Sequence, residues 1–213
     1  METKPTFGQK YPALKDILSF LGFVGAVVLG TFILQSFVFR SYNVVGGSME
    51  NTLHSGDRII VNRVPPSLAH LASKEYIPQR GQIIVFANGG NTTMTNCEAP
   101  SDTQEQYLVK RVIAFPGERV KVKDGKLTVY NTEHPEGFSP DDETRKSAQD
   151  GPKENVSGSI NIVVPDGEIF VSGDNREGSH SYDSRNGLGT VPFCRIIGPA
   201  AVRIWPFSGI RIF

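Results

Sequence analysis

The chain has 213 residues, of which 38% are hydrophobic and 21% are charged, a balance typical of one folded domain with a short additional segment. Its 22 Lys and Arg residues equal its 22 Asp and Glu residues, so no strongly basic surface indicates a nucleic-acid partner. Cys97 and Cys194 are the only cysteines, and neither has a neighbour at a metal-ligand spacing. We expect no metal or other cofactor, and the sequence leaves open whether these cysteines form a disulfide or remain free thiols.

The first predicted element is an uncharged apolar run from Ile17 to Phe39. As a helix it would reach ~34 Å, enough to cross a bilayer. A cleavable signal peptide is the alternative, but its apolar core is usually only ~7–15 residues long and ends at small residues. This run ends instead in Phe37-Val38-Phe39-Arg40. We therefore predict a retained transmembrane helix over residues 17–39, after a cytoplasmic N-terminus over residues 1–16.

The charges beside this run predict its orientation. Lys4, Lys10 and Lys15 precede the run, whereas only Arg40 follows it closely. Positive charge is enriched on the cytoplasmic side, so we expect the rest of the chain to be extracytoplasmic.

Small residues recur along one face of the predicted helix, at Gly22, Ala26 and Gly30. This spacing is compatible with a homodimer through helix packing. Such spacing is also common by chance in apolar segments, so we do not favour a dimer.

Residues 41–213 are predicted to form one mainly β domain. Short apolar runs bounded by turn residues predict strands, and Asp124-Gly125 predicts a hairpin between two of them. Two polar stretches, over residues 88–106 and 131–158, are interpreted as surface excursions. Many short strands favour a coiled antiparallel β-sheet, sandwich or barrel-like. The expected strands cover 58–62, 82–86, 107–114, 120–123, 127–130, 160–164, 169–172 and 200–205.

Ser48 and Lys110 are the candidate reactive residues. Ser48 lies in a glycine-rich turn, and Lys110 lies within an apolar strand. Burial beside Val109 and Val112 would lower the pKa of the lysine until its neutral amine can accept a proton. Alternatively, Lys110 extends its ammonium into solvent and Ser48 caps a turn.

A polar loop over residues 172–185 is the third candidate element. It contains two Asp-x-Arg sequences, Asp174/Arg176 and Asp183/Arg185. We expect each pair to form an ion pair that braces the loop.

Together these segments resemble the boxes of the bacterial and organellar type I signal peptidases. The resemblance implies a membrane-anchored serine endopeptidase with a Ser–Lys dyad. Such an enzyme removes signal peptides from exported preproteins after small residues in an Ala-x-Ala pattern, and its sheet fold is shared with SOS-type repressors. The matching segments, in chain order, are 46–53, 55–63, 80–86, 110–118, 173–176 and 183–185.

The resemblance also implies a role for each matching residue. Ser48 would be the nucleophile and Lys110 the general base, with backbone N–H groups of Ser48 and Gly47 in the oxyanion hole. The substrate would lie as an extended strand between two segments of the chain. Its binding residues would be Asn43, Val44, Val45, Gly46, Leu108 and Val109.

Four departures from the family pattern are visible, and one of them is Ala114 in place of a usual glycine. Gly46 stands where some members carry an oxyanion-hole serine, and Asn51 stands where proline is usual, which should loosen the turn after Ser48. Two extra residues in the last box leave either Ser179 or Ser181 as the lysine-orienting serine. We favour Ser181, because it lies only two residues before Asp183, so its position relative to the matching segment 183–185 can vary less.

Other functions are compatible with parts of the pattern. His180 and Asp183 could form a Ser–His–Asp triad with Ser48. The chain could also be a non-enzymatic membrane-tethered β domain, or an inactive relative. A self-cleaving SOS-type repressor shares the Ser–Lys pair, but it carries a helix-turn-helix domain where this chain has an apolar run.

The acidic run Asp141-Asp142-Glu143 is interpreted as a solvated patch rather than a calcium site.

Overall fold

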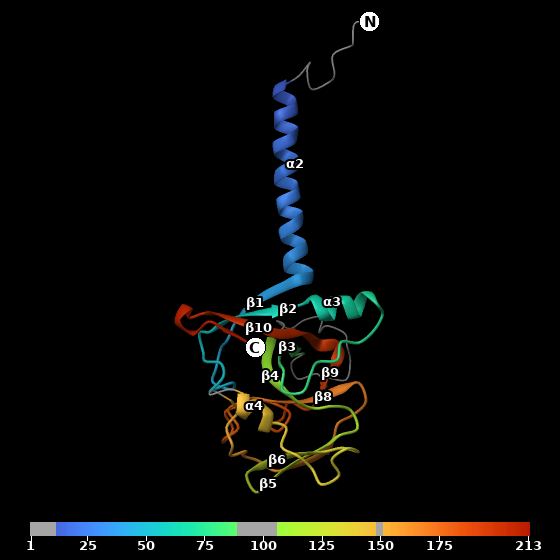
Figure 1. Cartoon of the computed structure of the whole chain (residues 1–213), viewed down its shortest axis with the longest axis vertical. Helices are drawn as coiled ribbons and strands as arrows, with labels where there is room; N and C mark the ends of the chain where they lie inside the picture. The colour runs from blue at the N-terminus through green and yellow to red at the C-terminus, as the bar shows by residue number, and fades with distance from the viewer. Residues whose placement is uncertain (1–11, 89–105, 148–150) are drawn as a thin grey trace, which may run out of the picture.

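The computed structural model describes residues 12–88, 106–147 and 151–213. A single long helix projects from a compact β domain (Figure 1). It comprises α2 (Pro12–Ile33) and one π-helical turn, η1 (Leu34–Val38). The segment Ala13–Val38 reaches a mean hydropathy of 2.5, so by length and composition it can cross a membrane. Lys4 and Lys10, which bear on its orientation, lie outside the described residues.

The larger sheet begins directly below this helix. Its strand order is β1-β2-β10-β3-β4-β8-β9, with β11 beside β10, and every pairing is antiparallel. The mainly antiparallel β fold expected from the sequence is therefore confirmed. The strands are β1 (Phe39–Asn43), β2 (Arg58–Asn62), β3 (Ile83–Asn88), β4 (Gln106–Ala114), β8 (Glu168–Ser172), β9 (Val191–Pro192), β10 (Ile196–Trp205) and β11 (Arg211–Ile212).

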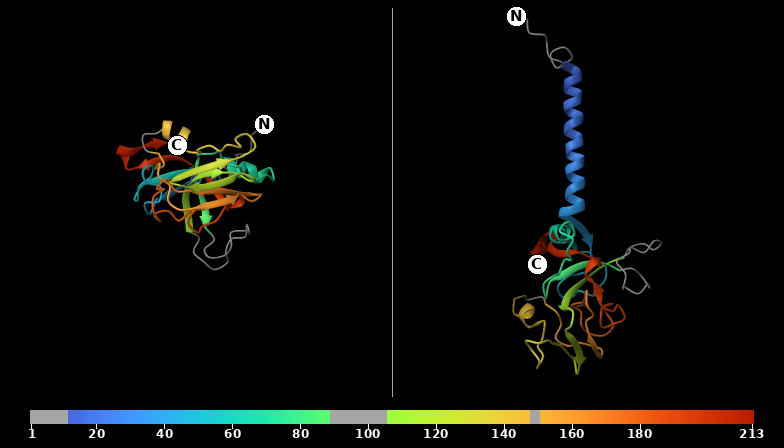
Figure 2. Two further views of the ribbon diagram at one scale, coloured as in Figure 1. Left: turned by 90° about the horizontal axis from the view of Figure 1, so that it is seen from below. Right: turned by 90° about the vertical axis from the view of Figure 1, so that its right-hand side faces the viewer.

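A smaller sheet forms the end of the domain that is farthest from α2 (Figures 1 and 2). It contains β5 (Arg119–Lys123), β6 (Lys126–Tyr130) and β7 (Ile160–Val163) in the order β6-β5-β7. β5 and β6 form the predicted hairpin. Asp124 and Gly125 both have positive φ, 52° and 76°, as a tight turn between two strands requires.

The buried core next to the candidate site lies beneath the chain that carries Ser48. Val44, Met49 and Leu53 are buried there against Val61 and Val85. Met49 and Leu53 are fully enclosed, so the turn that carries Ser48 is fixed to the sheet by apolar packing.

Short helices fill the connections: α3 (Val64–Leu71), α4 (Asp142–Ser147), and the 3₁₀ turns η2 (Phe193–Arg195) and η3 (Phe207–Gly209). α3 lies at the foot of α2, while α4 falls within the predicted excursion 131–158 (Figure 1). Cys194, in η2, is disulfide-bonded and so is not a free thiol. Cys97 and most of the excursion 88–106 lie outside the described residues.

Candidate active site

Ser48 is presented by a turn that follows β1. Gly46 has a φ of 91°, a conformation that residues with side chains rarely adopt, and this lets the chain leave the strand direction. The loop after β8 holds the turn from the other side. The Asn175 backbone N–H donates to the Ser48 carbonyl at 3.0 Å, and the Asn175 side-chain amide donates to the Gly47 carbonyl at 3.1 Å. The carbonyl groups before and after the Ser48 side chain are thus both fixed. The turn also stays closed despite Asn51, since the backbone N–H groups of Thr52 and Leu53 both donate to the Met49 carbonyl at 2.8 Å.

Lys110 reaches Ser48 from the middle of β4. Its side chain Nζ lies 2.7 Å from Ser48 Oγ and 2.9 Å from the Val109 carbonyl oxygen. The residue is only 2% exposed. Burial lowers the pKa of the Lys110 amine from 10.5 to about 8, although the nearby carboxylates of Asp183 and Asp174 oppose the shift. The alternative in which Lys110 extends into solvent is therefore wrong.

An ion pair holds each of these two carboxylates in place. Arg185 Nη2 lies 2.8 Å from Asp183, and Arg111 donates to both oxygens of Asp174 at 2.7 and 2.5 Å. Burial alone would raise the pKa of the Asp183 carboxyl, but the hydrogen bonds and positive charge of Arg185 outweigh it and lower that pKa. Arg185 in turn lowers the pKa of Lys110, so the amine lies within a balance of opposite charges.

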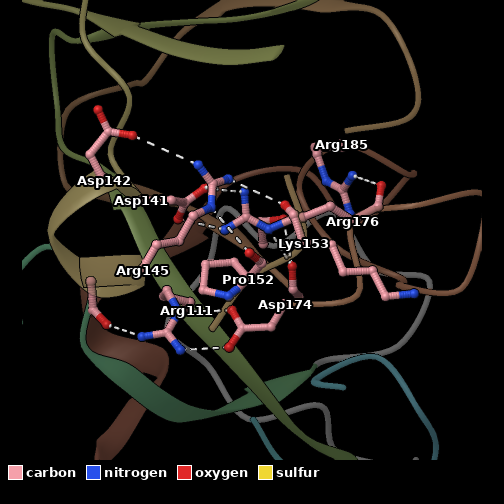
Figure 3. Close-up of polar contacts among 12 residues, drawn as sticks. Arg111, Asp141, Asp142, Arg145, Pro152, Lys153, Asp174, Arg176 and Arg185 are labelled. Atoms are coloured by element: carbon pink, nitrogen blue, oxygen red, sulfur yellow. Dashed lines mark hydrogen bonds and ion pairs between the residues drawn. The ribbon is translucent and has the colours of Figure 1, made fainter. Parts of the chain in front are cut away.

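The prediction of an ion pair between Asp174 and Arg176 is wrong. Asp183 and Arg185 do pair, but Asp174 pairs with Arg111 instead of Arg176. Arg176 pairs with Asp141 of the excursion, at 2.7 and 2.8 Å (Figure 3). The sequence separation of two residues did not bring Asp174 and Arg176 together, because each side chain has a closer partner on another segment.

Asp141 is the polar residue of this region that sequence reasoning missed. It is 1% exposed, so its interpretation as part of a solvated patch is wrong. Its neighbour Asp142 is exposed and only pairs loosely with Arg145, at 3.7 Å. An acidic run gives no signal that distinguishes a buried member from an exposed one, because the distinction depends on where Arg176 lies.

The excursion also contacts the loop through its backbone. The Lys153 N–H donates to the Asp174 carbonyl at 3.0 Å, and the Ser157 N–H donates to the Arg176 carbonyl at 2.9 Å. Lys153, Asp174 and Arg176 lie together in Figure 3. The polar stretch 131–158 thus supports the loop that faces Lys110.

The two candidate orienting serines differ in burial. Ser179 is exposed, whereas Ser181 is buried against Gly173, next to the carbonyl of Ser48. The Ser181 hydroxyl is close enough to Asp183 to help lower the pKa of that carboxyl, yet it has no hydrogen bond of good geometry within the described residues. His180, the histidine of the alternative triad, is exposed.

A cleft of about 270 Å³ opens beside Ser48 and Lys110. It runs between the end of β1 and the first half of β4. Both Val44, which is buried, and Val45, which is exposed, line it. Five of the six predicted substrate-binding residues line it, all except Gly46: Asn43, Val44, Val45, Leu108 and Val109.

Comparisons with known proteins match most of this chain. The family model described as "Signal peptidase, peptidase S26" matches residues 15–205. The chain is 34% identical over 187 residues to signal peptidase I T of Bacillus subtilis, covering 86% of this chain and 83% of the relative. It is 30% identical over 210 residues to signal peptidase IB of Staphylococcus aureus, covering 92% of this chain and 94% of the relative.

A crystal structure of a signal peptidase I from Enterococcus faecalis aligns with 59% of this chain and 97% of its own, at 27% identity and a TM-score of 0.40. The family model spans most of the chain, from the long apolar helix to the end of β10. The chain belongs to the signal peptidase family, peptidase S26.

Proposed function

We propose that this protein is a membrane-anchored serine endopeptidase that removes N-terminal signal peptides from preproteins, with Ser48 as nucleophile and Lys110 as general base. Membership of the signal peptidase family supports the activity. The observation that carries the assignment of residues is the 2.7 Å contact between Lys110 Nζ and Ser48 Oγ in a buried setting.

The reaction follows from the chemistry of these two groups. The neutral Lys110 amine accepts the proton of the Ser48 hydroxyl as Oγ attacks the carbonyl carbon of the scissile peptide bond. The resulting ammonium then protonates the departing amine, so the peptide bond breaks and an acyl-enzyme remains. Water, deprotonated by the same amine, attacks the ester and releases the signal peptide with Ser48 restored.

Two further roles complete the proposed site. Backbone N–H groups of Ser48 and Gly47 stabilise the oxyanion, each well-placed donor being worth roughly 3–4 kcal/mol. The Ser181 hydroxyl, which has no hydrogen bond within the described residues, would turn to bond the Lys110 amine and orient it; the burial of Ser181 beside Gly173 and the exposure of Ser179 support this assignment. The loop residues Asp174, Arg176, Asp183 and Arg185 hold this serine in place.

The cleft beside Ser48 supports a preference for small side chains. We propose that the substrate lies in it as an extended strand, hydrogen-bonded to residues 43–47 and 108–110. A cleft of about 270 Å³ walled by Val44 and Val109 leaves little room beside the substrate backbone. Small residues in an Ala-x-Ala pattern would fit.

The long apolar helix suggests a membrane anchor, and it supports the proposed organisation of the chain. In that organisation residues 1–16 are cytoplasmic, residues 17–39 span the bilayer and residues 41–213 form the extracytoplasmic peptidase domain. Ser48 follows Phe39 by nine residues, so it stays within ~30 Å of the membrane surface. A preprotein whose apolar segment lies in the same bilayer is thereby held near the nucleophile.

The test is cleavage of one Ala-x-Ala preprotein by the full chain in proteoliposomes. The wild type should release the mature protein, while Ser48→Ala and Lys110→Ala should not, with a cooperative thermal unfolding transition in each variant showing that the fold is intact. Lys110→Arg should also fail, because a guanidinium remains protonated. Turnover by Lys110→Ala would remove the Ser–Lys proposal, and an inactive wild type would favour a non-enzymatic relative. Loss of activity in His180→Ala would favour the histidine triad.

A further inference from the structure

Helix α3 carries an apolar stripe that the domain does not cover. Val64, Leu68 and Leu71 are spaced by four and three residues, so they share one face of the helix. They are 36%, 60% and 83% exposed, respectively. The stripe therefore faces outward along the whole length of α3.

The start of α3 is fixed to the end of the long apolar helix. The Ser67 hydroxyl donates to the Phe37 carbonyl at 3.1 Å, and the Arg63 N–H donates to the Val38 carbonyl at 2.8 Å. Phe37 and Val38 are the last residues of the segment that is long and apolar enough to cross a membrane. If that segment crosses a bilayer, the first turn of α3 must lie at the bilayer surface.

The direction of α3 also suits a surface location. The helix runs across the foot of α2 rather than along it, as Figure 1 and the right-hand view of Figure 2 show. Its other side packs against β10 of the domain. Ala69, which lies on that other side, is only partly exposed. The apolar stripe therefore points away from the domain, on the side where the bilayer would lie.

We infer that α3 is a second membrane contact, in which Val64, Leu68 and Leu71 enter the interfacial region of the lipid bilayer. Short amphipathic helices bind in this way when an apolar face can be buried at the boundary of headgroups and acyl chains. Exposed Lys74 follows the helix and can reach lipid phosphates, although Glu75 beside it limits the net attraction. Apolar burial, rather than charge, would hold the helix in place.

A second contact has a consequence for the orientation of the domain. A domain joined to the membrane by one helix can rotate about that helix and tilt over it. Docking of α3 would remove both freedoms and hold the β1–β2 end of the sheet against the bilayer. The inference rests on the long helix being an anchor and does not require the peptidase activity.

The experiment places an environment-sensitive fluorophore on the stripe of the full chain in liposomes. Leu71→Cys carries the label, and some of the lipids carry a nitroxide quencher near the headgroup. Val163→Cys is the matched control, because Val163 is also an exposed apolar residue but lies on β7 of the small sheet, far from α2. We expect lipid quenching at residue 71 and none at residue 163.

A second substitution tests whether the stripe itself makes the contact. Adding Leu68→Gln to the labelled Leu71→Cys chain should lower the equilibrium constant for docking of α3 about tenfold or more. Burial of one leucine side chain favours docking by at least about this factor. Leu68→Ile should leave the quenching intact. Equal quenching at residues 71 and 163 would overturn the inference, as would quenching that Leu68→Gln does not change. Energy transfer between labelled chains without lipid quenching would assign the stripe to a second copy and overturn it equally.

Discussion

The lowered pKa of Lys110 predicts how the rate of peptide cleavage depends on pH. Burial lowers this pKa from 10.5 to about 8. At pH 7 an amine with the ordinary pKa would be neutral in only about 0.03% of molecules, whereas a pKa of about 8 gives about 9%. Burial thus supplies a gain of about 300-fold in the form of Lys110 that can accept a proton.

The prediction can be tested by measuring the initial rate of cleavage of an Ala-x-Ala peptide between pH 6 and pH 10. The value of kcat/KM should rise about ninefold from pH 6 to pH 7 and about fivefold from pH 7 to pH 8, because the neutral fraction of the Lys110 amine rises by these factors. Above that pH the rate should level off. His180→Ala should show the same rise, since the proton acceptor is Lys110.

A charge substitution tests the same pKa from a second direction. Asp183 raises the pKa of Lys110, and Arg185, its ion-pair partner, lowers it. In Asp183→Asn the first effect is lost and the positive charge of Arg185 is no longer balanced, so both changes lower the pKa of Lys110. The rise in rate should move to lower pH, even if the plateau falls.

Three results would show that the charge and burial of Lys110 do not set the rate in this way. A rise centred near the ordinary lysine pKa would mean that burial does not tune Lys110. A rise near the histidine pKa that His180→Ala abolishes would replace the base. A shift of the profile to higher pH in Asp183→Asn would mean that the carboxylate does not act on the amine as its position indicates.

Further predictions concern stability and the supporting residues. Lys110→Met should raise the free energy of unfolding at pH 6 by about 3 kcal/mol. The reason is that Lys110 has a lower pKa in the folded chain than in the unfolded chain, so the folded state is destabilised wherever the unfolded chain binds the proton. The gain should shrink between pH 8 and pH 10.5, and urea titrations at several pH values would measure it. Asp141→Asn should lower the free energy of unfolding by about 3–5 kcal/mol, because Arg176 then stays buried without a counter-charge. Asp142 is exposed, so Asp142→Asn should change the free energy of unfolding by less than about 0.5 kcal/mol. Equal effects of the two would contradict the burial argument. Ser181→Ala should lower kcat at least about tenfold with little change in KM, while Ser179→Ala should leave both unchanged; the reverse outcome would assign the orienting role to Ser179.

Much of the fold was accessible from the sequence because its signals are local. The strand over residues 58–62 and the hairpin about Asp124-Gly125 depend on short apolar runs and on one turn, and both were predicted. β1 was missed, since Phe39–Asn43 follows directly on an apolar run and becomes a strand only by pairing with β2. α3 was missed as well. Pro65 and Pro66 suggest a break in regular structure, yet prolines in the first turn of a helix are well tolerated.

Some residues of the candidate site could likewise be predicted from the sequence, and others could not. Ser48 and Lys110 could be selected from residue type and context, and the structure brings their side chains to 2.7 Å. The partner of Arg176 could not be selected, because Asp141 lies 35 positions away on a polar stretch with no regular pattern. Pairing between distant charged residues depends on the tertiary fold, and a single sequence carries no local record of it.

This pairing gives the excursion over residues 131–158 a role in the electrostatics of Lys110. Arg176, neutralised by Asp141, donates through Nε to the Gly173 carbonyl at 2.6 Å, and Gly173 is the residue against which Ser181 packs. The Gly173 N–H donates to Asp183 at 2.9 Å, and Asp183 raises the pKa of Lys110. A change that loosens the excursion would therefore alter both the proposed orienting serine and a charge that sets the pKa of the base. On this argument the excursion, although outside every box that resembles the family, belongs to the support of the active site.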